Sequence, residues 1–124
     1  MILIFLLKVV SRLPFWFLYL FADFLYFIAY KVVGYRKAVV YENIKGSFPE
    51  KSEEEIQKIV KGFYKNLSQV LVELLKNISI SKEEVKKRVK VVNGELLENY
   101  LKSGIPVLVM AGHQANWEWV YIAS

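Results

Sequence analysis

Cysteine is absent from this chain of 124 residues, and histidine occurs once, at His113. Without cysteine, neither a disulfide framework nor a thiolate zinc site can form. A metal site with one histidine would need several carboxylates close together, and the sequence has no such cluster. We therefore expect no metal site and no metal cofactor.

The body of the chain also lacks a basic stripe, although the net charge is +5. Residues 1–47 carry six basic and two acidic side chains, whereas the rest of the chain carries 11 basic and ten acidic ones. The positive excess therefore lies beside the apolar N-terminal third. This distribution suits anionic lipid headgroups, so we expect a membrane lipid as partner and no nucleic acid.

Charge is scarce in the N-terminal third. Residues 13–30, LPFWFLYLFADFLYFIAY, contain one charged side chain, Asp23. A membrane-spanning helix needs about 20 mostly apolar residues, so this run suits a helix that spans the bilayer or lies in its interface. A cleaved signal peptide would have a basic start and a small-residue cleavage site. A soluble core helix would not be apolar on every face. We expect a membrane anchor over residues 1–33.

The flanks of the apolar run bear on its orientation. Four basic side chains follow it, namely Lys31, Arg36, Lys37 and Lys45. By the positive-inside tendency they favour a cytoplasmic location for residues 34–124. Lys8 and Arg12 on the other flank weaken that bias.

A long amphipathic helix is predicted over about residues 53–78. Ser52 and Glu55 have the spacing of a capping box, which marks a helix N-terminus. Apolar residues then recur at steps of three and four: Ile56, Ile59, Val60, Phe63, Leu67, Val70, Leu71, Leu74 and Ile78. We interpret this stripe as core packing.

The remaining segments predict alternating strands and helices. Ser81 with Glu84 indicates a short capped turn, and residues 89–93, VKVVN, read as a strand. A helix capped by Asn93 then ends near Gly104. Residues 105–111, IPVLVMA, form a continuous apolar run typical of a strand buried on both faces. The order predicts a parallel βαβ unit and an α/β fold class with the start of a mostly parallel sheet.

The stretch GHQANWEW, residues 112–119, follows that predicted strand, where open α/β sheets place their chemistry. Glu118 comes five residues after His113. Five residues within one continuous helix lie about 140° apart, so the pair meets only if the chain turns at His113. The carboxylate would then orient the imidazole, and the imidazole would take a proton from a hydroxyl group. The residues alone leave an ordinary structural histidine as the alternative.

Several segments, in order, resemble the bacterial lipid A late acyltransferases, which are membrane-anchored lauroyl and myristoyl transferases. GHQANWE is similar to their H-x4-D/E motif in the form GH-x-GNWE. The aromatic-rich anchor, YRKAVVYENIKGSFPE, the helix starting SEEE, and VNGELLENYLKSGIPVLVMAGH also follow the family's order. The resemblance covers essentially all 124 residues.

The resemblance implies a glycerolipid-acyltransferase-like fold and an enzyme of the bacterial inner membrane with its catalytic part facing the cytoplasm. His113 would be the general base and Glu118 its orienting carboxylate, while Asn116 and Trp117 would shape the substrate-binding site. The implied reaction moves a fatty acyl chain from acyl carrier protein, or from acyl-CoA, to a hydroxyl of a lipid A precursor. No cofactor is implied.

The sequence departs from the family pattern in two respects. Ala115 stands where the commonest family form has glycine, and family members are considerably longer. We therefore expect residues 34–124 to be an incomplete N-terminal part of the acyltransferase domain, with little activity alone. The alternatives are an acyltransferase for another membrane glycolipid or phospholipid, or a non-catalytic, membrane-anchored interaction module.

Overall fold

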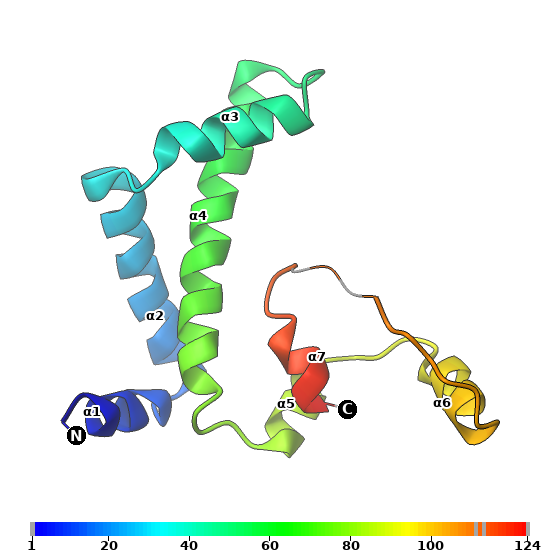
Figure 1. Cartoon of the computed structure of the whole chain (residues 1–124). Coiled ribbons are helices and arrows are strands. Elements are labelled where there is room, and N and C mark those ends of the chain that lie inside the picture. Colours follow the sequence, from blue (N-terminus) through cyan, green and yellow to red (C-terminus); the bar gives the residue numbers. More distant parts are fainter. Residues whose placement is uncertain (1, 111, 113, 124) are drawn as a thin grey trace. The chain divides into compact units, whose positions relative to one another are not determined.

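The computed structural model describes residues 2–110, 112 and 114–123. The chain forms two compact units, Met1–Ser79 and Ile80–Ser124. The first contains α1 (Ile2–Ser11), α2 (Phe15–Tyr26), the π-helix η1 (Phe27–Val33), α3 (Lys37–Ser47) and α4 (Glu53–Lys76), and the second contains α5 (Lys82–Arg88), α6 (Gly94–Lys102) and α7 (Glu118–Ala123). Across the described residues, all regular elements are helices (Figure 1). The division into an anchor, 1–33, and a body, 34–124, stays a prediction.

The helices α2 and η1 form one continuous apolar helix, Phe15–Val33. Its 19 residues are long and apolar enough to cross a membrane, so it could serve as the predicted anchor. Pro14 precedes the helix with φ −65°, a value to which its ring restricts it. Gly34 ends the helix with φ +63°, and the next amide, of Tyr35, donates to the Ala29 carbonyl at 2.9 Å. This left-handed ending is typical of helix C-termini and requires the freedom of glycine.

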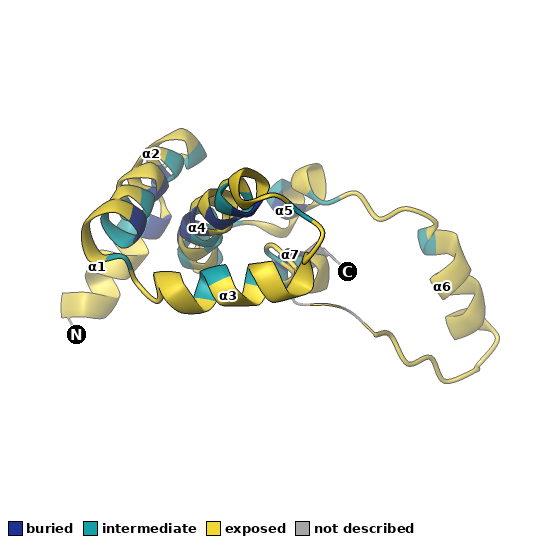
Figure 2. Ribbon diagram, turned by 90° about the horizontal axis from the view of Figure 1, so that it is seen from above, coloured by how far each residue is buried: buried dark blue, intermediate teal, exposed yellow. Residues whose placement is uncertain are grey.

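The amphipathic helix α4 lies antiparallel beside α2 (Figure 1). The buried side chains between them form two clusters, Leu18, Ala22 and Val72 in one and Tyr30, Ile56, Val60 and Tyr64 in the other. By contrast, α1 and α3 are exposed along most of their length (Figure 2). The core of the first unit is thus a seam along one face of α2, η1 and α4.

Polar contacts join the two ends of this seam. At one end, the Lys76 ammonium donates to the Leu13 carbonyl at 2.8 Å, and the Ser79 hydroxyl donates to the Ser11 carbonyl at 2.6 Å. At the other end, the hydroxyl of Tyr64 donates to the backbone carbonyl of Tyr35. The contacts lie at Tyr64 and Lys76 of α4 and involve Tyr35 and Leu13, which flank the apolar helix. The helix α4 therefore extends beside the apolar helix from one of its ends to the other.

The prediction of a long amphipathic helix is confirmed by α4. The Ser52 hydroxyl accepts from the amide of Glu55 at 3.3 Å, and the Glu55 carboxylate accepts from the amide of Ser52 at 3.0 Å. This reciprocal capping box satisfies two backbone amides that no helical carbonyl can reach. The helix α3 was not predicted, because its apolar residues are few and lack a long periodic stripe.

The second unit has a small core. Val85 of α5 is fully buried and Trp119 of α7 is 8% exposed, and these two helices pack on each other. The predicted cap at Ser81 is confirmed, since its hydroxyl accepts from the Glu84 amide at 3.2 Å. The predicted helix before Gly104 is also confirmed as α6, although the Asn93 side chain makes no capping hydrogen bond.

The predicted sheet is wrong over the part of the chain that the structure describes. Neither residues 89–93 nor residues 105–110 form a strand, and Leu108 and Met110 are 88% and 90% exposed. A β-strand is held in place by hydrogen bonds to a neighbouring strand, and even an isolated pair of strands is only marginally stable in water. An apolar run alone does not supply that neighbour, so the described fold is all-helical rather than α/β.

Candidate active site

Residues 115–117 form a bend and turn that lead into α7. The amide of Gln114 donates to the Gly112 carbonyl at 2.9 Å, and the amide of Trp119 donates to the Asn116 carbonyl at 3.2 Å. The helix then begins at Glu118. His113, the predicted general base, lies outside the described residues.

Ala115, within this turn, adopts a left-handed backbone conformation with φ +50°. Such a conformation brings Cβ close to a backbone carbonyl oxygen and is disfavoured for residues other than glycine. In the motif that the sequence resembles, glycine stands at this position, and it would adopt this conformation without strain because it has no Cβ.

Glu118, the predicted orienting carboxylate, is half-buried at the first position of α7. Its Oε2 atom is buried and has no hydrogen-bond partner among the described residues. A buried carboxylate oxygen without a donor is unfavourable, and such atoms in native proteins call for an explanation. The arrangement leaves Glu118 able to accept a hydrogen bond from an N–H group.

Asn116 and Trp117, the predicted substrate-binding residues, directly precede Glu118 in the turn. Asn116 is half-buried and Trp117 is 40% exposed, whereas Trp119 contributes to the core of the second unit. Asn116, Trp117 and Glu118 therefore follow one another at the start of α7. The two tryptophans have different surroundings, and only Trp117 presents a large surface to a ligand.

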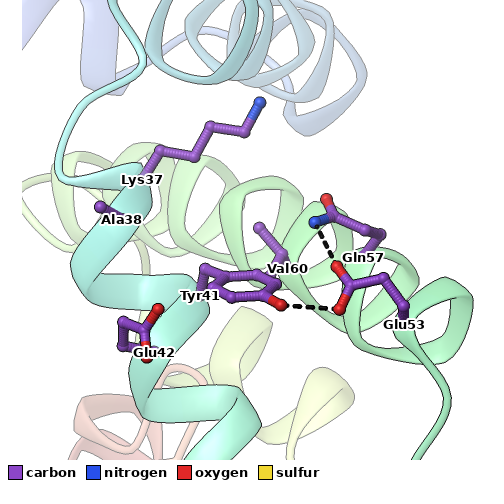
Figure 3. A pocket seen from close by; sticks show the side chains of 7 residues that line it. All are labelled: Lys37, Ala38, Tyr41, Glu42, Glu53, Gln57 and Val60. Carbon is purple, nitrogen blue, oxygen red and sulfur yellow. Dashed lines mark hydrogen bonds between the residues drawn. The ribbon is translucent and has the colours of Figure 1, made fainter.

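A separate groove lies in the first unit between α3 and α4 (Figure 3). There the Glu53 carboxylate accepts hydrogen bonds from the Tyr41 hydroxyl at 2.6 Å and from the Gln57 amide at 3.1 Å. The Tyr41 bond, followed by that of Gln57, lowers the pKa of Glu53, and the same hydroxyl raises the pKa of Lys45, which donates to it at 3.1 Å. Glu53 and Lys45 are thus both hydrogen-bonded through Tyr41, and this network joins α3 to α4.

Among the described residues, no group of three His, Cys, Asp or Glu side chains is arranged to hold a metal ion.

Comparison with known proteins identifies the family. The model of the bacterial lipid A biosynthesis acyltransferases matches residues 1–123, nearly the whole chain. No curated protein and no solved structure matches the chain. The matched range includes the apolar N-terminal helix, α4 and the stretch GHQANWE. The chain therefore belongs to the bacterial lipid A biosynthesis acyltransferase family.

Proposed function

We propose that the turn from Gly112 to Glu118 contributes the acid–base pair of an O-acyltransferase, with His113 as general base and Glu118 as its orienting carboxylate. The observation that carries this proposal is the buried, unpartnered Oε2 of Glu118 at the start of α7. A carboxylate in this state is suited to accept one ring N–H of a histidine, which would fix the tautomer and stabilise the imidazolium.

The reaction follows from the chemistry of that pair. The acyl donor is a thioester, on acyl carrier protein or coenzyme A, and the acceptor is a hydroxyl of a lipid A precursor. His113 removes the hydroxyl proton while the acceptor oxygen attacks the thioester carbonyl. The tetrahedral intermediate then collapses, the carbon–sulfur bond breaks, and the imidazolium returns the proton to the thiolate. The products are an ester and a free thiol, and no cofactor is consumed.

Asn116 and Trp117 have distinct parts in this proposal. The exposed surface of Trp117 offers an apolar face to an acyl chain or to the acceptor lipid. Asn116 carries an amide that can donate to or accept from a polar group of the substrate. Both roles are binding roles, so their loss should raise the KM more than it lowers kcat.

The test uses the natural gene in its bacterial host, with the lipid A profile read by mass spectrometry. His113→Ala and Glu118→Gln should each remove one acyl chain from lipid A, at unchanged protein level. Gln114→Ala is the matched control, because Gln114 is exposed in the same turn and has no assigned role. An unchanged profile in the His113 variant would instead support a non-catalytic, membrane-anchored interaction module.

A second readout concerns the acceptor and the proton. The purified product of the natural gene, supplied with acyl carrier protein thioesters, should acylate a lipid A precursor in preference to other glycolipids or phospholipids, whereas residues 1–124 alone should show little activity. Its rate should fall in acid, where a histidine is protonated and cannot act as a base. Transfer to a different lipid would retain the chemistry and reassign the acceptor, whereas a rate unaffected by acid would contradict the base.

A further inference from the structure

Two grooves of the first unit adjoin at Tyr35 and Leu67, which line both of them. The first, which we call the α3 groove, has a volume of about 230 Å³ and lies where α3 passes across α4 (Figure 1). The second, the apolar groove, has a volume of about 310 Å³ and lies between the apolar helix and α4. Its other apolar lining residues are Leu25, Ile28, Ala29, Val33 and Leu71. The shared lining makes the two grooves neighbouring parts of one elongated binding surface.

The α3 groove carries a positive charge. Arg36 lines it and is exposed, and its guanidinium has no ion-pair or hydrogen-bond partner among the described residues. Asn43, also in the lining, lies seven residues further along, which is nearly two helical turns and places both side chains on one face of α3. No acidic side chain is among the described residues that line this groove. Because guanidinium and amide N–H groups both donate hydrogen bonds, the two side chains together suit an anion.

The backbone holds Arg36 in an unfavourable conformation. Its φ of +51° lies in the left-handed region, which is disfavoured for residues other than glycine. The hydroxyl of Tyr64 donates to the backbone carbonyl of Tyr35, the preceding residue, and so ties this part of the chain to α4. Strained residues of this kind are concentrated at ligand sites, where the surrounding structure holds them in place. The strain at Arg36 therefore agrees with a binding role for the α3 groove.

The apolar groove offers a ligand few polar partners. Among the described residues that line it, the polar groups are the hydroxyls of Ser68 and Tyr35. Val33 and Leu71 are 66% and 50% exposed, so a ligand seated here removes apolar surface from water. The groove runs between two helices packed side by side, and a narrow apolar groove suits a single alkyl chain.

We propose that the adjoining grooves bind the anion of a long-chain fatty acid, with its carboxylate at Arg36 and Asn43 and its alkyl chain between η1 and α4. A carboxylate carries one negative charge, which matches the single guanidinium, and its two oxygens accept the parallel N–H bonds of the guanidinium fork. A phosphate monoester carries a charge of about −1.5 to −2 at pH 7 and would leave part of it unpaired here. The site belongs to the first unit and takes the free acid rather than a thioester, so it does not depend on the acyltransferase chemistry proposed for the second unit.

Photolabelling is the first test of this site. Hexadecanoic acid with a diazirine in its chain is added to the full chain in phosphatidylcholine vesicles, at mildly alkaline pH where the acid is ionised. Mass spectrometry should find the label on the peptides that contain Val33 and Leu71. Label spread evenly over all apolar helices of the first unit would refute a defined site.

Competition by unlabelled amphiphiles of the same chain length tests the head group. Hexadecanoate should displace the photoprobe, whereas hexadecanol and hexadecyl phosphate should each compete about tenfold less well. Equal competition by the alcohol would overturn the role of the charge. Stronger competition by the phosphate would overturn the assignment of a carboxylate.

Arg36→Gly separates binding from folding, because it removes the guanidinium and relieves the left-handed strain together. Labelling should fall about tenfold or more, while the unfolding midpoint stays unchanged or rises. Arg12→Gln is the matched control, since Arg12 is an exposed arginine of the same unit and is not among the groove residues. An equal loss of labelling in both variants would mean general attraction to positive charge and contradict the site. Full labelling of Arg36→Gly would contradict it as well.

Two leucines of α4 test the place of the alkyl chain. Leu71 lines the apolar groove and is 50% exposed, whereas Leu74 is 36% exposed and is not among the groove residues. Leu71→Trp should fill the groove and lower labelling about tenfold, and Leu74→Trp should leave it unchanged. Circular dichroism checks that both variants keep their helices. Equal labelling of the two variants would refute the seating of the chain between η1 and α4.

Discussion

The hydroxyl of Tyr19 on α2 donates a hydrogen bond of 2.8 Å to Oε1 of Glu73 on α4, across 54 residues of sequence. Both side chains are half-buried beside the cluster of Leu18, Ala22 and Val72. A hydrogen bond to a carboxylate is stronger than one between neutral groups. The bond therefore fixes the register of two helices that apolar contacts alone would allow to slide.

Loss of this hydrogen bond should weaken the first unit. Tyr19→Phe removes the donor and leaves Glu73 without it, which should lower the free energy of unfolding by about 1.5–3 kcal/mol. Urea denaturation in mild detergent, followed by circular dichroism, measures the change. Tyr100→Phe, at an exposed position of α6, is the control. An equal loss in both variants would contradict a specific role for the bond.

Two leucines on α2 provide a matched comparison of packing and lipid contact. Leu18 is fully buried and Leu20 is 62% exposed. Leu18→Ala should cost about 2–5 kcal/mol of unfolding free energy in detergent, because it creates a cavity in the seam. Leu20→Ala should leave that stability nearly unchanged and weaken vesicle binding about tenfold. The reverse pattern would mean that the packed and open sides of α2 are wrongly assigned.

The left-handed conformation of Ala115 predicts a stabilising substitution. Ala115→Gly removes the Cβ that a φ of +50° disfavours and should raise stability by about 1 kcal/mol. Ala115→Val, with a branched Cβ, should lower it. Thermal unfolding monitored by tryptophan fluorescence reports on this turn, because Trp117 and Trp119 lie next to it. A less stable glycine variant would contradict the strained geometry.

The capping box predicts a pH dependence of α4. Hydrogen bonds from the backbone and hydroxyl of Ser52 lower the pKa of Glu55 below its ordinary value of 4.5. A lowered folded pKa means that the carboxylate stabilises the helix above the unfolded pKa, and that this stability is lost as the pH falls through the folded pKa. Unfolding midpoints measured from neutral to acid pH should fall less steeply for Glu55→Gln than for the natural chain.

Local signals in the sequence predicted local structure well. Ser52, Glu55 and the apolar steps from Ile56 onward predicted α4 because a capping box and a helical period act within a few residues. The Ser81 cap of α5 was found for the same reason. The strand predictions failed at residues 89–93 and at the described residues 105–110, because a strand requires a partner distant in sequence and an apolar run is only a weak sign of one.

The assignment of the candidate site residues stays a prediction from the sequence. The spacing of His113 and Glu118 and the order of the surrounding motifs indicated the family, and the start of α7 at Glu118 agrees with a turn before the carboxylate. The choice of packing face on α2 was beyond prediction, because that helix is apolar all round. The covered side is marked by Leu18 and Ala22, which are buried against Val72 of α4, and by the Tyr19 hydroxyl, which donates to Glu73.

The contact between Ser79 and Ser11 has a consequence for protein engineering. The Ser79 hydroxyl donates to the Ser11 carbonyl at 2.6 Å, so residues 11–79 begin and end at adjacent points. Segments whose two junctions lie together tolerate circular permutation and insertion into other proteins. We therefore expect residues 11–79 to tolerate insertion into another protein, because a short linker can bridge the two junctions.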